Sequence, residues 1–199
     1  MRERLAEVIN REPDLAVCGE AEDRDRAIQT ISSTQPGLII VDLTLRNSDG
    51  MELIKDVRAR WPRMLMLVVS MHDETLYAER SLRAGARGYI TKQEATRNIL
   101  LAIRRVLQGN IYLNPELSSS LISRLVTASP TQPPAALLAD RELQVFQLTG
   151  QGLPIRQIAR RLHISAKTVE TYRARIRDKL QLRDGADLLQ TAIAWTHRG

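Results

Sequence analysis

Three residues of different chemistry follow three apolar runs of the sequence, one residue per run. Asp42 ends "GLIIVD", Ser70 ends "MLMLVVS", and Lys92 follows "GYIT". A carboxylate can attack the phosphorus atom of a phosphoryl donor, while a hydroxyl and an ammonium group bind the transferred oxygens as negative charge shifts onto them. Any one of these residues alone is more typical of an ordinary loop or strand end. Their repetition, one per run, predicts a phosphoryl-accepting site.

Apolar runs typical of buried strands alternate with amphipathic stretches through the first half of the chain. The expected strands are 15–21, 37–43, 64–70 and 88–91, and the expected helices lie around 23–34, 51–60, 73–84 and 95–108. Strands alternating with helices of this length form a parallel sheet with helices on both faces. The carboxyl ends of such strands meet at one edge of the sheet, which brings Asp42, Ser70 and Lys92 together. The sequence therefore predicts a doubly wound α/β domain.

The pattern changes after "QGN" at 108–110. The segment "NPELSSSLISRLVTA" predicts a helix over 114–128 that starts with Pro115. "SPTQPPAA", over 129–136, is rich in proline and has little to bury, so it is expected to be a linker. From there on only short helical patterns follow. We expect three parts: an α/β domain over 1–110, a connecting helix and linker over 111–136, and a small all-α domain over 137–199.

Composition limits the class of protein. The 199 residues are 43% hydrophobic and include one cysteine, which excludes an intramolecular disulfide. No run approaches the roughly 18 apolar residues of a membrane-spanning helix and no secretory signal opens the chain, so we expect a cytoplasmic protein. Basic residues outnumber acidic ones by 11 to 6 over 138–199, against 18 to 17 in the rest. This asymmetry favours a polyanionic partner for the C-terminal part, and nucleic acid is the first candidate.

The segments "VDLTLRNSDGMELI", "VVSMHDE" and "AGARGYITK" resemble the receiver domain of NarL/FixJ-type two-component response regulators, which has a flavodoxin-like fold. The resemblance implies that Asp42 is the phosphoacceptor, Ser70 the switch hydroxyl and Lys92 the lysine of the site. It also implies that Tyr89 is the aromatic residue whose rotamer reports phosphorylation. A Mg²⁺ cofactor, held by Asp42 and the backbone carbonyl of Thr44, and a sensor histidine kinase as partner follow from the same resemblance.

The sequence departs from that receiver pattern in two places. Arg46 stands where the family usually has a proline, a change expected to affect only the stiffness of the loop. Relative to the family, the chain begins inside the first helix, so we expect a buried first strand with an acidic pair to be absent and the magnesium site to be poorer. A start assigned too far downstream, a rearranged receiver that works without phosphorylation, and a partner strand that fills the gap are three open explanations.

The segment 154–180 is typical of a helix, a short turn and a second helix. The apolar residues of "PIRQIARRL" fall on one face, and Ser165 is expected to cap the next helix. In that helix Val169, Ile176 and Leu180 form part of an inward stripe. This layout places a recognition helix in the major groove of DNA. The stretch from "LADRELQV" to "RDKL" resembles the LuxR-type helix-turn-helix domain over about forty residues.

The outward face of that second helix carries the residues expected to bind double-stranded DNA. Those expected to contact phosphates, which give affinity without sequence choice, are Lys167, Arg173 and Lys179. Those expected to read base edges are Thr168, Glu170, Thr171 and Arg175. The family's fourth helix commonly forms the dimer contact on DNA, which the resemblance assigns here to Leu188, Leu189 and Ile193.

These features favour a homodimeric, non-enzymatic transcription regulator that binds specific DNA under the control of phosphorylation at Asp42. One alternative keeps DNA binding but has a degenerate receiver that is independent of phosphorylation. A more remote alternative is an aspartyl-phosphate phosphotransfer enzyme, which needs a second catalytic carboxylate near Asp42. Leu43 and Thr44 do not supply one, and Asp49 lies beyond a loop.

Overall fold

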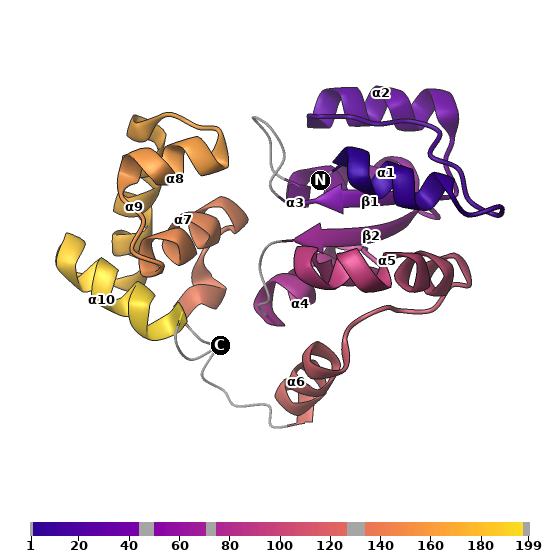
Figure 1. Ribbon diagram of the computed structural model, residues 1–199. Coiled ribbons are helices and arrows are strands. Elements are labelled where there is room, and N and C mark those ends of the chain that lie inside the picture. Colours follow the sequence, from indigo (N-terminus) through magenta and orange to yellow (C-terminus); the bar gives the residue numbers. More distant parts are fainter. Residues whose placement is uncertain (1, 44–49, 71–74, 127–133, 197–199) are drawn as a thin grey trace. The chain divides into compact units, whose positions relative to one another are not determined.

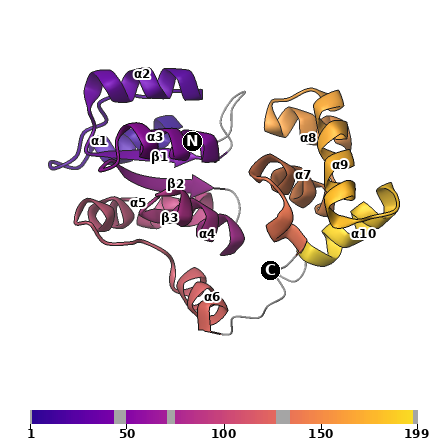
Figure 2. The ribbon, with the colours of Figure 1, turned by 180° about the vertical axis from the view of Figure 1, so that it is seen from behind.

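The computed structural model describes residues 2–43, 50–70, 75–126 and 134–196. Contacts divide the chain into two compact units, Met1–Asp73 with Ala78–Asn114, and Glu74–Tyr77 with Pro115–Gly199 (Figures 1 and 2). None of the described helices is both long and apolar enough to cross a lipid bilayer.

The strands of the described residues are β1 Leu38–Asp42, β2 Leu65–Ser70 and β3 Gly88–Thr91. The α-helices are α1 Arg2–Asn10, α2 Arg24–Thr34, α3 Gly50–Arg60, α4 Thr75–Ala84, α5 Lys92–Leu107, α6 Pro115–Val126, α7 Asp140–Gly150, α8 Ile155–Leu162, α9 Ala166–Leu180 and α10 Gly185–Thr196. A short 3₁₀ helix, η1, spans Pro134–Leu137.

The sheet of the described residues is parallel, with the strand order β1-β2-β3. Asp42 at the end of β1 lies opposite Val69 of β2. Ser70 at the end of β2 lies opposite Thr91 at the end of β3. The three strand ends therefore form one edge, and α3 and α4 make the connections between successive strands. This arrangement confirms the predicted doubly wound α/β domain and three of its four predicted strands.

Helices cover both faces of the sheet. α1 and α5 pack on one face, where Ile9 of α1 joins Leu67 and Val69 of β2 and Ile99 and Ile103 of α5 in one buried cluster. α5 lies in front of the sheet in Figure 1, whereas α3 lies in front in the opposite view of Figure 2. The strands are apolar on both sides because both sides are covered.

The predicted strand at 15–21 is wrong. Those residues have no regular secondary structure and form no ladder with a described strand, and the described partner of β1 is β2. Leu15 and Val17 still pack against the core shared with α1 and α5, while the backbone N–H of Val17 donates to Oδ1 of Asn10 at 2.8 Å. Cys18, the single cysteine of the chain, lies in this segment and is exposed. Alternating apolar residues can place a chain on a core, but a strand also needs a hydrogen-bonded neighbour.

The helix-turn-helix of the second unit consists of α8 and α9, as predicted. His163 turns the chain between them in the left-handed conformation, with φ of 54°, and the backbone N–H of Ile164 bonds to the carbonyl oxygen of Ala159 at 3.0 Å. α6 begins at Pro115, as expected. Most of the predicted linker over 129–136 lies outside the described residues, and its last part is η1, in which Ala135 is fully buried.

Candidate phosphorylation site and nucleic-acid interface

Asp42 and Lys92 meet at the carboxyl edge of the sheet. The Nζ atom of Lys92 lies 2.5 Å from Oδ2 of Asp42, and 19% of the lysine side chain and 34% of the aspartate side chain are exposed. The pair joins the end of β1 to the first residue of α5 across the width of the sheet. A carboxylate that is partly exposed can meet a small phosphoryl donor, and the ammonium group beside it can balance the charge that the phosphoryl group adds.

Ser70 and Tyr89 lie on the strands beside this pair, and both are fully buried. Ser70 ends β2, the strand between those that carry the ion pair. Tyr89 lies within β3, opposite Val68 of β2. The hydroxyl that the sequence assigned to the site is therefore at the predicted edge, and the aromatic ring whose rotamer is expected to report phosphorylation is buried.

Gly50 lets α3 start directly beside Asp42. A Cβ atom at this position would come within 2.4 Å of the carbonyl oxygen of Asp42 and 2.6 Å of the Cα atom of Leu43. The backbone N–H of Gly50 also donates to the carbonyl oxygen of Leu43 at 3.2 Å. Only a residue without a side chain permits this approach, so Gly50 fixes the position of the backbone that carries Asp42.

The described residues do not by themselves form a magnesium site. They contain no group of three or more aspartate, glutamate, histidine or cysteine side chains that could hold a metal ion. Asp42 is the carboxylate of the predicted site, and its oxygen is already paired with Lys92. Thr44, the predicted carbonyl ligand, and Arg46 lie outside the described residues. Asp42 alone gives Mg²⁺ a poor set of protein ligands, and a bound ion would take most of its oxygens from water and from the phosphoryl donor.

Ser165 caps the predicted recognition helix, α9. Its Oγ accepts a hydrogen bond from the backbone N–H of Thr168 at 3.0 Å and also lies 2.7 Å from Oγ1 of Thr168. Val169 and Ile176 of α9 are fully buried. The cap and the inward stripe, both predicted from the sequence, thus fix where α9 starts and which way it faces.

The outward face of α9 presents four of the predicted DNA-binding residues to solvent. Those four exposed residues are Lys167, Glu170, Thr171 and Arg175. The hydroxyl of Thr171 donates to the carbonyl oxygen of Lys167 at 3.0 Å, a bond within α9 itself. Thr168 is half-buried, because its hydroxyl contacts the Ser165 cap.

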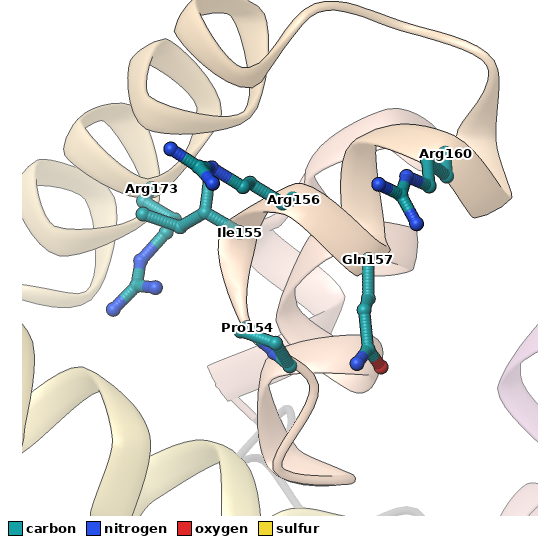
Figure 3. A pocket seen from close by; sticks show the side chains of 6 residues that line it. All are labelled: Pro154, Ile155, Arg156, Gln157, Arg160 and Arg173. Atoms are coloured by element: carbon teal, nitrogen blue, oxygen red, sulfur yellow. The ribbon is translucent and has the colours of Figure 1, made fainter.

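Arg173 lies on the flank of α9 next to α8. Figure 3 shows its side chain in an open pocket, together with Pro154, Ile155, Arg156, Gln157 and Arg160 of the α8 end. Burial lowers the pKa of Arg173, the positive charge of Arg177 lowers it further, and Glu170 opposes both. Pro154 supplies no side-chain cap for α8. Three arginines thus surround an uncapped helix start, with the guanidinium groups of Arg173 and Arg160 on opposite sides of it in Figure 3. Their positive charge and the N-terminal end of the helix favour an anion such as a DNA phosphate.

Lys179 lies on the opposite flank and is paired within the domain. Its Nζ atom lies 2.6 Å from Oε2 of Glu142 on α7, whose side chain is only 4% exposed. The same Oε2 atom accepts the backbone N–H of Ala139 at 2.8 Å, at the start of α7. Ala139 has no side chain that could accept a bond in return, so half of a capping box forms. The ammonium group of Lys179 is thus already paired with Glu142 inside the domain. Its expected contact with a DNA phosphate stays a prediction.

Three residues next to this interface were missed from the sequence. Arg156 and Arg160 of α8 line the pocket with Arg173. Ala174 shares the outward face of α9 with Lys167 and Thr171 and is half-exposed. Spacing of 3.6 residues per turn would have placed Ala174 on that face, where a small side chain permits close approach to a groove. The two arginines carry no such signal, because the pocket depends on how α8 and α9 pack.

The predicted dimer residues of α10 differ in exposure. Leu188 is fully buried in the second unit, while Leu189 is 39% and Ile193 is 36% exposed. Leu188 therefore belongs to the core of this unit, and the other two form an apolar outer face.

Two family descriptions match this chain. Residues 1–104 match the response regulator receiver domain, and residues 136–192 match the bacterial regulatory proteins of the luxR family. The oxygen regulatory protein NreC of Staphylococcus carnosus (strain TM300) is 30% identical over 192 residues, which cover 94% of this chain and 88% of that protein.

Solved structures have the same fold. A two-component response regulator of the LuxR family from Aurantimonas sp. SI85-9A1 is 30% identical, with a TM-score of 0.59 over 63% of this chain and 89% of that one. RcsB of Salmonella enterica serovar Typhimurium, bound to the promoter rprA, is 22% identical, with a TM-score of 0.60 over 96% of this chain and 92% of that one. The chain therefore belongs to the response regulators of two-component systems that join a receiver domain to a LuxR-type DNA-binding domain, a family of transcription regulators and not of enzymes.

Proposed function

We propose that this response regulator binds specific DNA as a homodimer and that a sensor histidine kinase controls it by phosphorylating Asp42. The observation that carries the proposal is the contact between Asp42 and Lys92, 2.5 Å apart at the carboxyl edge of the receiver sheet, which joins the end of β1 to the first residue of α5. The same chain carries a LuxR-type domain whose α9 exposes a polar and basic face. Because its ligand is DNA, its place of action is the cytoplasm.

The chemistry at Asp42 follows from its surroundings. An oxygen of the carboxylate attacks the phosphorus atom of the donor, and the bond from phosphorus to the donor's leaving group breaks. Lys92 then faces a phosphoryl group of greater negative charge than the carboxylate alone, so its ammonium group is attracted to the new oxygens. Ser70, at the end of the neighbouring strand, is the hydroxyl expected to bind one of them.

Receiver domains use Mg²⁺ for this reaction, and Mg²⁺ dependence is part of the proposal for this chain. The described residues contain one carboxylate at the site and no cluster of three. The alternative in which DNA binding does not depend on phosphorylation therefore stays open. The two functions differ only in what happens at Asp42, and one measurement separates them.

On the DNA side, the outward face of α9 is proposed to enter the major groove. Thr171 and Arg175 are exposed there and are proposed to read base edges, together with Glu170. The pocket between α8 and the flank of α9 is proposed to take a backbone phosphate through Arg156, Arg160 and Arg173. Such contacts fix the position of the helix and add salt dependence without choosing a sequence.

The test is the intact mass of the chain after incubation with acetyl phosphate and Mg²⁺, repeated with EDTA. We expect one phosphoryl adduct on the unchanged chain and none on Asp42→Asn. Asp25→Asn, an exposed aspartate at the start of α2, is the matched control and keeps the adduct. Affinity for DNA fragments selected by the chain is then measured with and without the donor.

The outcomes separate the two functions. An adduct lost in Asp42→Asn, with DNA affinity that rises on phosphorylation, supports control through Asp42. Absence of any adduct, with DNA affinity unchanged by the donor, contradicts that control and leaves the phosphorylation-independent regulator.

A further inference from the structure

The segment that leaves α5 folds back along the outer edge of β3. Tyr112 forms a parallel bridge with Gly88. The backbone N–H of Tyr89 donates to the carbonyl oxygen of Tyr112 at 2.9 Å, and the N–H of Tyr112 donates to the carbonyl oxygen of Arg87 at 3.0 Å. A Cβ atom on Gly88 would lie 3.3 Å from the Cβ of Tyr112, so the glycine keeps this edge accessible. The last residues of the first unit are thus attached to its sheet.

Glu94 of α5 binds this segment with both oxygens of its carboxylate. Oε1 accepts the hydroxyl of Tyr112 at 3.0 Å, and Oε2 accepts the side-chain N–H of Asn114 at 3.4 Å. Burial, and then the bond to Glu94, raise the pKa of Tyr112 to about 12, so its hydroxyl keeps the proton that it donates. Asn114 is the last residue of the first unit, and Pro115 begins α6 in the second. One carboxylate therefore holds the point where the chain leaves the receiver.

The same helical turn also touches the phosphoacceptor. Lys92, two residues before Glu94, is paired with Asp42 at 2.5 Å. Thr91 caps the turn, since its Oγ1 accepts the backbone N–H of Glu94 at 3.1 Å. Thr91 also lies opposite Ser70 in the sheet. The first turn of α5 therefore has Asp42 and Ser70 on one side and the exit from the receiver on the other.

We propose that Glu94 is a positioning residue that transmits the state of Asp42 to the segment entering α6. This inference rests on the proposed function, because it assigns a route to the control exerted at Asp42. The two bonds of Glu94 hold Tyr112 and Asn114 only while the first turn of α5 keeps its place. The Asp42–Lys92 pair holds that turn from the other end. A change of partner at Lys92 loosens the turn, weakens both bonds of Glu94, and releases Tyr112 from the edge of β3.

The test is a double-mutant cycle read by hydrogen exchange of the full chain, using the peptide that contains the amide of Tyr112. Tyr112→Phe removes the donor to Glu94 but keeps the ring, and we expect it to speed exchange of that amide by about tenfold. Asp42→Asn removes the carboxylate that pairs with Lys92 and leaves Glu94 and Tyr112 unchanged in sequence. It is also expected to speed exchange of the Tyr112 amide. The double variant is expected to exchange more slowly than the product of the two single effects predicts, because both act on one connected network.

Gln93→Ala is the matched control, since Gln93 is exposed in the same helical turn, and it is expected to leave the exchange unchanged. Lys92→Gln breaks the same pair from the other side and replaces Asp42→Asn if that variant does not fold. If Asp42→Asn and Lys92→Gln both exchange like the unchanged chain, or if the two effects multiply fully, transmission through Glu94 is refuted. No phosphoryl donor enters this cycle, so failure of the mass test at Asp42 and failure of this coupling are distinguishable.

Discussion

Lys179 and Arg175 lie four residues apart on α9 and carry the same charge, but their surroundings differ. Arg175 is exposed on the outward face of the helix. Lys179 is paired with Glu142, whose carboxylate is 4% exposed and also holds the start of α7. Removing the lysine would leave the buried carboxylate of Glu142 without its opposite charge and bound to the backbone N–H of Ala139, which costs more than the pair itself gains. Arg175 is therefore the residue proposed to contact DNA, whereas Lys179 helps to hold α9 against α7.

Lys179→Met is therefore expected to destabilise the C-terminal domain by about 2 kcal/mol. This cost is smaller than for a fully buried ion pair, because 41% of the lysine side chain is exposed. Arg175→Ala, the comparison variant, is expected to change stability by less than about 0.5 kcal/mol. It is expected instead to lower the preference for the selected DNA site by about 1–3 kcal/mol. Thermal unfolding and binding to selected and scrambled DNA measure both effects. If the Lys179→Met chain had an unchanged Tm and its DNA affinity depended less on salt, Lys179 would instead contact a phosphate, as expected from the sequence.

The sequence predicted individual residues well where one local pattern carries the information. Asp42 and Lys92 each follow an apolar run, and parallel strands bring such positions to one edge, so their meeting was expected. Ser165 was recognised as a cap from its place before a helical stripe. The Glu142–Lys179 pair was missed because its members are 37 residues apart and meet only through helix packing. Glu94 was missed for a similar reason, since Tyr112 reaches it by folding back along β3.

At the scale of elements, α2 and α3 are tied together by an ion pair between Arg24 and Asp56. The hydrogen bond from the Arg24 guanidinium holds the pKa of Asp56 below its ordinary value of 3.8, while partial burial opposes this shift. Arg24 thus binds the ionised carboxylate of Asp56 more tightly than the protonated carboxyl group. The pair adds stability when Asp56 is ionised and loses that stability when it is protonated.

Asp56→Asn is expected to lower the free energy of unfolding by about 0.5–1 kcal/mol near neutral pH, since both side chains are partly exposed. The difference in the free energy of unfolding between the two chains is expected to be complete above the ordinary aspartate pKa of 3.8. It is expected to vanish as the pH falls through the lower pKa that Asp56 has in the folded chain. Denaturant unfolding at pH values between about 3 and 7 measures it. Asp25→Asn, on the exposed start of α2, serves as the comparison. A difference that grows towards low pH would contradict the assignment.

Strands and helices were predicted correctly where the spacing of apolar residues and the length of the segment indicate the same element. A strand was mispredicted where hydrogen-bonded pairing with a neighbouring strand decides. β1, β2 and β3 lie inside the expected ranges, because each is an uninterrupted apolar run between helices. The segment 15–21 has a similar composition but no described hydrogen-bonded neighbour, so it is not a strand. α5 begins at Lys92, three residues earlier than expected, because the side chain of Thr91 caps it.

At the scale of the whole molecule, the proposed homodimer needs a surface that the single chain leaves uncovered. Leu189 and Ile193 of α10 are 39% and 36% exposed and lie one helical turn apart. Two copies paired through this face would present two α9 helices to successive turns of the major groove, which is the geometry of binding to half-sites one turn apart.

Ile193→Arg is expected to weaken binding to a two-half-site DNA by about tenfold or more, because it places like charges opposite each other in a paired α10. Binding to a single half-site is expected to stay unchanged, and so is the Tm. Leu188→Ala, in the core of the unit, is the contrasting variant and is expected to lower the Tm through the cavity it leaves. Equal loss on one and two half-sites would show that α10 does not join the copies.

The packing of α1 against α5 has a consequence for the order in which a nascent chain can fold. The strands pair in chain order, so each newly made strand finds its neighbour already present. Ile9 of α1, in contrast, is buried against α5, whose residues 92–107 are made more than eighty positions later. Ribosomes synthesise roughly 5–20 residues per second, so the apolar side of α1 stays exposed for several seconds before α5 has been made. Of the described elements, α1 is thus made well before the helix that covers it and is among the last to be buried in the receiver.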